Sequence, residues 1–529
     1  MEYTNPVIFA DYSDPDVIRV GDCYYMTASS FHFAPGLPLL MSRDLVHWNL
    51  VGYAAKSIPL PQYNAPRHSK GIWAPSLRYL NGKFIITVGL PDEGIFVTEA
   101  TDFLGDWTPL RCVKESRGFI DPCPFWDDDG KAYIVHAYAK SRIGFKSRLG
   151  IFEVDPETLE AIGDDSFIFI GDETQPTIEG PKVYKHGSFY YIFAPAGGVK
   201  QGWQTELRSF SIHGPFSEQI VLEQGSSHIN GAHQGGLVDD GEGKEYFLHF
   251  QDRGIYGRVI SLEPAEWRDG WCVMGSAVAN GGLLGEPVDS GEMPKKLSNR
   301  ALQGVSATQA SDSFERGSYG LQWQWQANVC EDDFVEKRES AGLCLRCKNG
   351  DGGTLWDIPN VLSEKIVFED FRAEIEMDVT NLAEGERAGA IFLGGQYAGV
   401  EIRLQNGVYQ LCYIESFTDP SDAEKRLEKI VGIDSGSLTD KAHVSFFIDF
   451  ASLPPDKDKA VLHLVDAEKA SAGVCTFCAQ LDGKMLKNES APYMCGGDHW
   501  VGGKIAIYAQ GKTGSVVVNH VTVSPKEKK

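Results

Sequence analysis

The chain has 529 residues, which is more than one hydrophobic core usually supports, so its length predicts two or three domains. It contains 49 Lys and Arg against 73 Asp and Glu, a formal net charge of −24. This excess of acids disfavours nucleic acid or an anionic membrane as a partner and fits a neutral substrate. The opening MEYTNPVIFADYSD lacks a signal-peptide pattern and no later apolar run reaches ~18 residues, so we expect a cytoplasmic protein with no membrane partner.

The eleven cysteines are scattered through the chain, which favours reduced thiols over a disulfide framework. Two pairs have C-x-x-C spacing, Cys344 with Cys347 and Cys475 with Cys478. Both pairs lie in alternating apolar segments that are typical of strands, where residues three apart point to opposite faces of the sheet. We therefore predict a structural role for these cysteines and not a zinc site.

Short alternating apolar segments separated by Gly, Asp, Asn and Pro recur along the chain, and long amphipathic helix patterns are almost absent. This pattern predicts an all-β fold. One motif occurs five times: a Pro or Gly-Gly start, an apolar strand, a polar turn with Gly, and an aromatic-rich strand. The copies are SDPDVIRVGDCYYMTAS, WAPSLRYLNGKFIITVG, IDPCPFWDDDGKAYIVHAY, EGPKVYKHGSFYYIFAP and QGGLVDDGEGKEYFLHF.

The spacing of these copies, about 47 to 60 residues, is typical of propeller blades, so we predict a five-bladed β-propeller over residues 1–295. A sandwich with coincidental hairpins is the alternative, but it does not explain five copies in register. Residues 296–312 lack periodic apolar pattern and are predicted to be a linker. Alternating strands then continue over residues 313–529 and predict a jelly-roll-like β-sandwich.

When the repeats are compared, three of them place an acid at the start, and we predict that these acids occupy equivalent positions. Asp14 and Asp121 each precede a proline, and Glu179 precedes Gly-Pro, whereas the second repeat has Ala74 and the fifth has His233 just before its Gln-Gly-Gly. Because the innermost strands of a propeller begin near the axis, we expect the three carboxylates to converge. Such a cluster is costly unless solvent, a cation or a substrate shares the space, since like charges raise one another's pKa.

Two carboxylates across a pocket are what glycosidic bond cleavage requires, and a third can raise the pKa of the acid. Phe31, Phe33 and Trp73 would suit the apolar face of a sugar, although ordinary packing explains each of them alone. Arg258 could donate hydrogen bonds to sugar hydroxyl groups. The remaining acids near the first repeat, Asp11 and Asp16, have no counterparts in other blades, so we predict a turn role for Asp11 and a solvent-facing strand edge for Asp16.

The segments NPVIFADYSDPDVIRVGDCYYM, GIWAPSLRY, FIDPCPFWDDDGKAYIV, IEGPKVYKHGSFYYIF and GAHQGGLVDD resemble glycoside hydrolase family 43, the five-bladed propeller β-xylosidases and α-L-arabinofuranosidases. The distal LQWQWQ and GGTLWDIPNVLSEK resemble the β-sandwich that follows the propeller in one branch of that family. The resemblance covers nearly the whole chain. It implies an exo-acting, inverting hydrolase that releases xylose, arabinose or both from the non-reducing end of xylo- or arabinoxylo-oligosaccharides.

The resemblance also implies roles for particular residues. Asp14 would be the general base that activates water, Asp121 the acid that orients its partner and tunes the partner's pKa, and Glu179 the general acid. Arg258 matches an arginine near the substrate. His233 matches a histidine that in many members ligates calcium or another cation through water near the axis, while the chemistry itself would need no cofactor.

Several alternatives stay open at this point. The loop YMCGGDHWVGG stands where relatives often present an aromatic residue to the pocket, so Trp500 or His499 could close it here. A non-catalytic sugar-binding propeller would keep the aromatic residues without needing the acids. A fructan-type propeller glycosidase would begin with an NDPNG-like motif, whereas this chain reads SDPDV. The choice between xylose and arabinofuranose is undecided, and a homo-oligomer is allowed.

Overall fold

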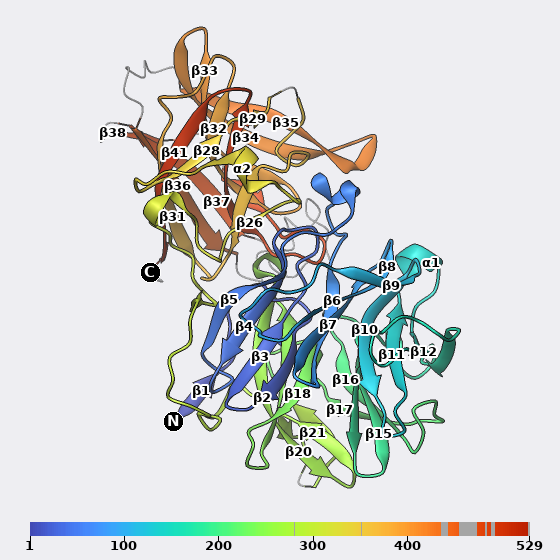
Figure 1. Ribbon diagram of the computed structural model, residues 1–529. Helices are drawn as coiled ribbons and strands as arrows, with labels where there is room; N and C mark the ends of the chain where they lie inside the picture. Colours follow the sequence, from blue (N-terminus) through green and yellow to red (C-terminus); the bar gives the residue numbers. More distant parts are fainter. Residues whose placement is uncertain are drawn as a thin grey trace.

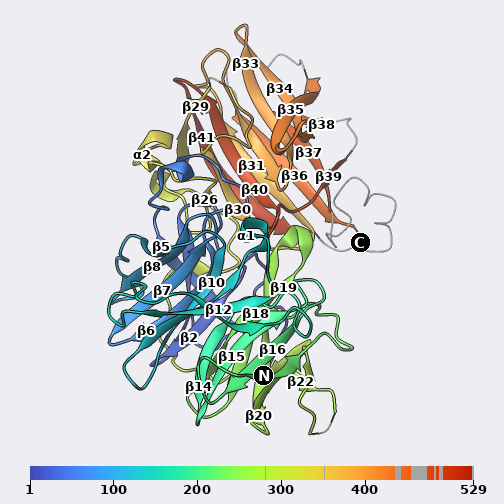
Figure 2. The same ribbon diagram turned by 90° about the vertical axis from the view of Figure 1, so that its right-hand side faces the viewer.

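A propeller and a β-sandwich make up the computed structural model, which describes residues 1–279, 281–350, 352–434, 443–453, 473–481, 484–487 and 492–526 (Figure 1). The propeller, coloured blue to green, lies below the sandwich, coloured yellow to red, and a view turned by 90° shows the same two bodies (Figure 2). The predicted all-β class is confirmed. None of the helices in the described ranges is long and apolar enough to cross a membrane.

Each of the five repeats forms a blade of four antiparallel strands, as predicted. In chain order, the blades are β2 (Asp16–Val20), β3 (Cys23–Thr27), β4 (Gly36–Ser42) and β5 (Trp48–Ala55); β6 (Trp73–Leu80), β7 (Lys83–Leu90), β8 (Gly94–Ala100) and β9 (Arg111–Glu115); β10 (Phe119–Trp126), β11 (Ala132–Tyr138), β12 (Arg148–Val154) and β13 (Ser166–Ile170); β14 (Lys182–His186), β15 (Phe189–Ala196), β16 (Trp203–Ser209) and β17 (Ser217–Leu222); and β18 (His233–Asp239), β19 (Glu245–Asp252), β20 (Arg258–Arg268) and β21 (Trp271–Met274). The short helix α1 (Lys140–Ile143) interrupts the loop between β11 and β12.

Segments that precede the first blade and follow the fifth blade in the sequence pair with strands of the propeller or with each other. Strand β1 (Glu2–Thr4) pairs with β24 (Ser290–Glu292), and Ile8 bridges to Ile260 of the fifth blade. Two short strands, β22 (Ser276–Ala277) and β23 (Gly285–Glu286), extend the fourth blade. Strand β25 (Val305–Ser306), which falls within the predicted linker, pairs with β5, so part of that segment belongs to the first blade.

The sandwich consists of two mainly antiparallel sheets. The first holds β26 (Gln324–Trp325), β30 (Val361–Lys365), β40 (Lys504–Gly511), β32 (Arg387–Leu393), β33 (Tyr397–Gln405), β34 (Val408–Asp419) and β35 (Asp422–Asp434), with β29 (Lys348–Asn349) beside β40; the second holds β27 (Val335–Glu336), β28 (Leu343–Arg346), β41 (Ser515–Pro525), β31 (Phe371–Asp378), β36 (His443–Ser452), β37 (Gly473–Leu481) and β38 (Lys484–Lys487), with β39 (Tyr493–Cys495) beside β37. The helix α2 (Glu331–Phe334) precedes β27. Strand β31 shows the expected alternation, because every second residue from Phe371 to Met377 is fully buried between the sheets.

Asp16 lies inside the propeller, so its predicted exposure to solvent is wrong. Its side chain is fully buried, and Oδ2 accepts hydrogen bonds from Arg78 Nη1 at 2.8 Å and Leu77 N at 2.8 Å. Lys182 of the fourth blade lies 3.7 Å from the same oxygen. A Cβ atom on Gly236 of the fifth blade would stand 2.8 Å from the other oxygen. Asp16 therefore contacts three other blades.

We call Asp16, Arg78 and Lys182 the axial ion cluster. Lys182 extends its Nζ across the propeller to Pro75 O at 2.8 Å and Ser76 Oγ at 2.7 Å, so the cluster joins blades that are not neighbours. Beyond it a channel of about 450 Å³, lined by the later residues of the inner strands, opens at the face away from the starts of these strands. The cluster therefore fills the axis between the two ends of the propeller.

The axial ion cluster predicts a large effect on stability. Asp16→Ala leaves two buried cations without their carboxylate, which costs roughly 3–5 kcal/mol for a buried pair. We expect a clearly lower melting temperature by calorimetry. Asp239→Ala is the matched control, because it removes the half-exposed partner of Arg19 and should change stability by less than about 1 kcal/mol. Equal melting temperatures for the two variants would contradict this account.

Candidate active site

The five inner strands all begin with the same unusual backbone conformation. The residues concerned have φ of +54° (Asp14), +40° (Ala74), +56° (Asp121), +55° (Gly180) and +39° (Gln234). The first four precede a proline and the fifth precedes Gly235. Residues other than glycine rarely adopt positive φ, and such strain concentrates at functional sites. All of these positions except Gly180 line one pocket at the axis.

The positive φ shows which residues of the five repeats are equivalent, and it corrects the predicted alignment of the three acids. Glu179 is not the counterpart of Asp14 and Asp121, because the positive φ and the following proline belong to Gly180. Glu179 stands one residue earlier, at the level of His233 in the fifth blade. The prediction of three acids at equivalent positions is therefore wrong by one residue. The convergence itself is observed, since all three carboxylates line the same pocket.

Asp14 is held by two strong donors. Arg258 Nη1 donates to its Oδ1 at 2.8 Å, and Ser29 Oγ donates to its Oδ2 at 2.6 Å. The same Arg258 nitrogen donates to Ser13 Oγ at 2.6 Å, while Ser29 Oγ accepts from Ala74 N at 2.7 Å. Charge-assisted bonds of this kind are short and strong, and they fix the orientation of the carboxylate. The arrangement suits an acceptor of a proton from water.

Asp121 is the most deeply placed of the three acids. Its residue is 5% exposed, and its Oδ2 accepts a hydrogen bond from Gly180 N at 2.8 Å. Burial raises the pKa of Asp121 well above the usual range of an aspartate, and the carboxylates of Glu179 and Asp14 raise it further. The surroundings of Asp121 therefore disfavour its ionised form.

Glu179 is more accessible than Asp121 and is oriented by a histidine. Its side chain is 28% exposed, and Oε1 lies 2.9 Å from His233 Nε2. His233 is buried at the first position of β18. The histidine thus holds the carboxyl group at the mouth of the pocket, where a leaving oxygen could receive its proton.

The side chains around His233 test whether the predicted calcium has ligands there. Nδ1 of this residue is buried and has no hydrogen-bond partner among the described atoms, so it could face a hydrated cation. However, the described residues contain no group of three His, Cys, Asp or Glu side chains that could hold a metal. Calcium prefers six to eight oxygen ligands, which these side chains do not supply. Calcium at the axis therefore stays a prediction, with water as its main ligand.

Aromatic residues from both domains form the wall of the pocket. Phe31 and Trp73 lie edge to face with ring centroids 6.4 Å apart, and both line the pocket as predicted. Trp500 of the sandwich also lines it, with the Arg258 guanidinium carbon 5.2 Å from its ring centroid. Of the two residues proposed to close the pocket, Trp500 therefore does so. Phe33 instead packs beneath the sandwich, where Lys504 Nζ lies 4.4 Å from its ring centroid.

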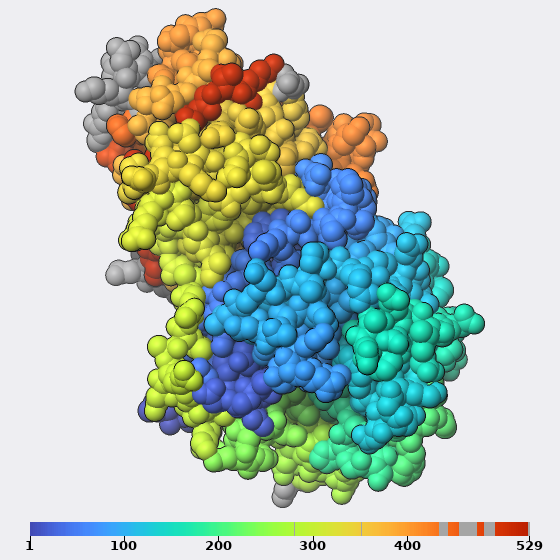
Figure 3. Space-filling model, in the orientation of Figure 1, coloured from blue at the N-terminus to red at the C-terminus, as the bar shows by residue number. Residues whose placement is uncertain are grey.

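Asp11 joins the sandwich to the site, which its predicted turn role did not include. It is 7% exposed, and its Oδ1 accepts a hydrogen bond from Arg258 N at 3.0 Å. Its Oδ2 accepts from Gly502 N of the sandwich at 2.9 Å. One carboxylate thereby fixes both the strand start that carries Arg258 and the loop that carries Trp500. Figure 3 shows that the two bodies also meet at the surface, where yellow segments of the sandwich lie against blue segments of the propeller.

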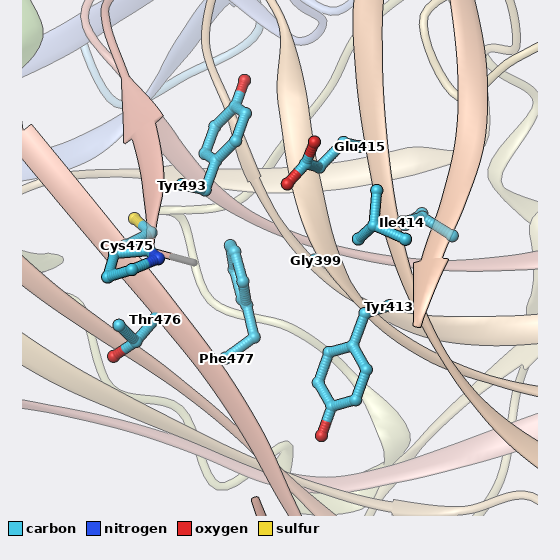
Figure 4. Close-up of a pocket in the computed structure, with 10 residues that line it drawn as sticks. Gly399, Tyr413, Ile414, Glu415, Cys475, Thr476, Phe477 and Tyr493 are labelled. Atoms are coloured by element: carbon cyan, nitrogen blue, oxygen red, sulfur yellow. The ribbon is translucent and has the colours of Figure 1, made fainter. Parts of the chain in front are cut away.

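The pocket opens into a larger cleft between the propeller and the sandwich, which we call the outer cleft. The cleft has a volume of about 980 Å³ and shares Trp73, Ile120, Glu179 and Trp500 with the pocket. A separate cavity of about 30 Å³ lies within the sandwich and includes Cys475 (Figure 4). No propeller residue lines that cavity, so it is unrelated to the carboxylates.

Sequence reasoning missed the serines that support Asp14 and the polar side chain of Gln234. Ser13 and Ser29 carry no pattern of their own, and only the fold brings them to Asp14 and Arg258. Gln234 could have been found by aligning the repeats on the residue before Pro or Gly, since it is the counterpart of Asp14.

A five-bladed propeller that gathers three carboxylates and an arginine in one pocket defines the class of protein as a glycosidase. The model "Glycosyl hydrolases family 43" matches residues 3–272, and the model "Beta xylosidase C-terminal Concanavalin A-like domain" matches residues 311–522. The chain belongs to glycosyl hydrolase family 43, which confirms the resemblance found in the sequence.

Individual relatives agree with this family. A "Putative beta-xylosidase" of Xylanibacter ruminicola is 35% identical over 77% of this chain and 73% of its own length. A "Xylosidase/arabinosidase" of Butyrivibrio fibrisolvens is 31% identical over 73% of this chain and 77% of its own. The solved structure of a bifunctional GH43-CE protein of Bacteroides eggerthii has a TM-score of 0.77 at 24% identity. It covers 99% of this chain, whereas the chain spans 64% of that protein.

Asp121→Asn should separate stability from activity. The amide keeps an acceptor for Gly180 N–H and removes a buried ionisable group. Because the pKa of Asp121 is raised in the folded state, its stabilising contribution is present below the unfolded pKa of about 4 and is lost as pH rises. We expect the variant to melt above wild type at pH 7 to 8 and near wild type at about pH 4, with activity lowered at least ~100-fold. A variant less stable than wild type at pH 7 would contradict the raised pKa.

Trp500→Ala should weaken substrate binding, because it removes the part of the pocket wall that the sandwich contributes. We expect KM for a nitrophenyl pentoside to rise about 10-fold or more, with a smaller change in kcat. His499→Ala is the control, since this neighbour is exposed and lines only the outer cleft. An unchanged KM for Trp500→Ala would show that the sandwich does not contribute to binding in the pocket.

Proposed function

We propose that this glycosidase removes single pentoses, xylose or arabinofuranose, from the non-reducing end of xylo- or arabinoxylo-oligosaccharides with inversion of configuration. The observation that carries this proposal is the shape of the site. The pocket holds all three carboxylates, Trp500 covers it, and the axial ion cluster fills the axis behind it. A sugar chain can enter such a pocket only by its end. The names of the relatives, "Putative beta-xylosidase" and "Xylosidase/arabinosidase", support a pentose as the sugar released.

In the proposed mechanism, Asp14 takes a proton from water while Arg258 and Ser29 hold its carboxylate in place. Glu179, oriented by His233, gives its proton to the leaving oxygen at the mouth of the pocket. Asp121, whose pKa is raised by burial and by the carboxylates of Glu179 and Asp14, accepts a hydrogen bond from Gly180 N and so fixes the strand start beside Glu179. An inverting enzyme needs this division of roles, with space for water beside the base.

Three further expectations belong to the proposal. The eleven cysteines are unbridged in the structure, which supports a reducing, cytoplasmic location. The net charge of −24 supports a substrate that is neither nucleic acid nor membrane lipid. A hydrated cation near His233 and a homo-oligomer remain predictions, to be tested by metal analysis of the purified protein and by its mass in solution.

Leaving-group dependence tests the assigned roles. Glu179→Ala should lower kcat/KM on xylobiose roughly 100- to 10,000-fold but much less on dinitrophenyl β-xyloside, whose leaving group needs no protonation. Asp14→Ala should be inactive on both substrates. The preferred sugar is determined by comparing kcat/KM for nitrophenyl α-arabinofuranoside with kcat/KM for nitrophenyl β-xyloside.

Proton NMR of the first product should show inverted configuration. Equal losses on both substrates for Glu179→Ala, or a first product with retained configuration, would refute the assignment. Failure of the wild type to cleave either pentoside would refute the proposed substrate class.

A further inference from the structure

The outer cleft carries a charge opposite to that of the protein. Among the described residues that line it, six are Lys or Arg and four are acidic, whereas the whole chain has 49 basic and 73 acidic residues. The six basic residues are Arg67, Lys70, Lys140, Arg142, Lys146 and Arg426. On the propeller side the only acid among the described lining residues is Glu179. A basic surface in an acidic protein points to an anionic ligand.

Most of these cations have no acidic partner. Within the described part of the chain, Arg67, Lys70, Lys140 and Lys146 form no ion pair, and Arg67 Nε is buried without a hydrogen-bond acceptor. Arg142 differs, because it pairs with Asp92 at 3.0 Å. A lone buried guanidinium nitrogen is costly unless a ligand or water satisfies it. The charge of the cleft is therefore available to a bound molecule.

The cleft also lies on the side where the leaving group must be. Glu179 and Trp73 line both the pocket and the cleft, so the bond that Glu179 would protonate lies at their junction. Arg142 lies over the Trp73 ring, 5.2 Å from its centroid, and fixes this part of the wall. On the opposite side, Arg426 lies 4.5 Å from the ring centroid of Trp356. The next sugars of the chain would therefore run between a basic propeller wall and a sandwich wall on which Arg426 stands among three acids, Asp357, Glu424 and Asp498.

We propose that the outer cleft binds a carboxylate carried by the leaving group, so that the preferred substrate is a pentose oligosaccharide bearing a uronic acid on the leaving side of the scissile bond. This inference rests on the proposed function and specifies its substrate class. The carboxylate lies against Lys140 and Lys146, and the sugar rings lie along Trp73. The wide cleft, about 980 Å³, accommodates a branched saccharide where the narrow pocket does not.

The test compares kcat/KM for xylotriose with that for the same trisaccharide bearing glucuronic acid on its reducing-end xylose. Wild type should prefer the acidic substrate roughly 5- to 20-fold at low salt, and 0.5 M NaCl should reduce the preference, because exposed pairs are weak individually and screened. The Lys140→Gln/Lys146→Gln double variant should lose most of the preference and keep its activity on xylotriose. Lys296→Gln, an exposed lysine outside the cleft, is the control and should retain it.

Two outcomes overturn the inference: equal kcat/KM for the two substrates in wild type, or an equal loss on both in the double variant. Inorganic phosphate is tested as a competitor. If it inhibits hydrolysis of the acidic substrate as strongly as glucuronosyl xylobiose does, the cleft recognises charge alone and the saccharide assignment is wrong.

Activity on nitrophenyl β-xyloside, whose leaving group carries no carboxylate, reports on the proposed function separately. If that activity is absent, calorimetric binding of the acidic trisaccharide to wild type and to the double variant still decides the inference. Tighter binding by wild type than by the double variant supports it, and equal binding refutes it.

Discussion

The positive φ at the start of every inner strand is the constraint on which the site depends. In three blades it coincides with a register shift between the first two strands, and the side chains at this level line the pocket at the axis. Two blades use the position for an aspartate and one for a glycine that lets Glu179 stand beside it. The strained backbone costs free energy at the four positions that are not glycine, and the hydrogen bonds from Gly180 and Arg258 to the acids help to offset it.

The carboxylate of Asp11 links the sandwich directly to the strand that supports the catalytic base. Asp11 binds the backbone of Arg258 on one side and of Gly502 on the other, so the strand that supports the base and the loop that brings Trp500 share one anchor. The bridge between Ala34 and Trp325 adds a direct backbone link between the two bodies. Neither domain alone would present the complete pocket.

Much of the fold and part of the site could be predicted from the sequence, because repeated strands leave a local pattern. The five blades, the sandwich, the three acids, Phe31, Trp73 and Arg258 all followed from motifs. What failed depended on contacts between distant segments. The residues around Asp16 in the sequence suggest a turn, because its partner Lys182 belongs to a distant blade. In the same way, nothing near Asp11 in the sequence indicates its hydrogen bond from Gly502, almost five hundred residues later.

The axial ion cluster has a kinetic consequence. Because Asp16, Arg78 and Lys182 fill the axis, the pocket has no rear exit, and everything that enters must leave by the mouth. The shortened oligosaccharide occupies that mouth after each cleavage, so it departs first and the free sugar last. An exo-acting enzyme of this architecture would therefore release its two products in a fixed order and part from the shortened chain after each cleavage.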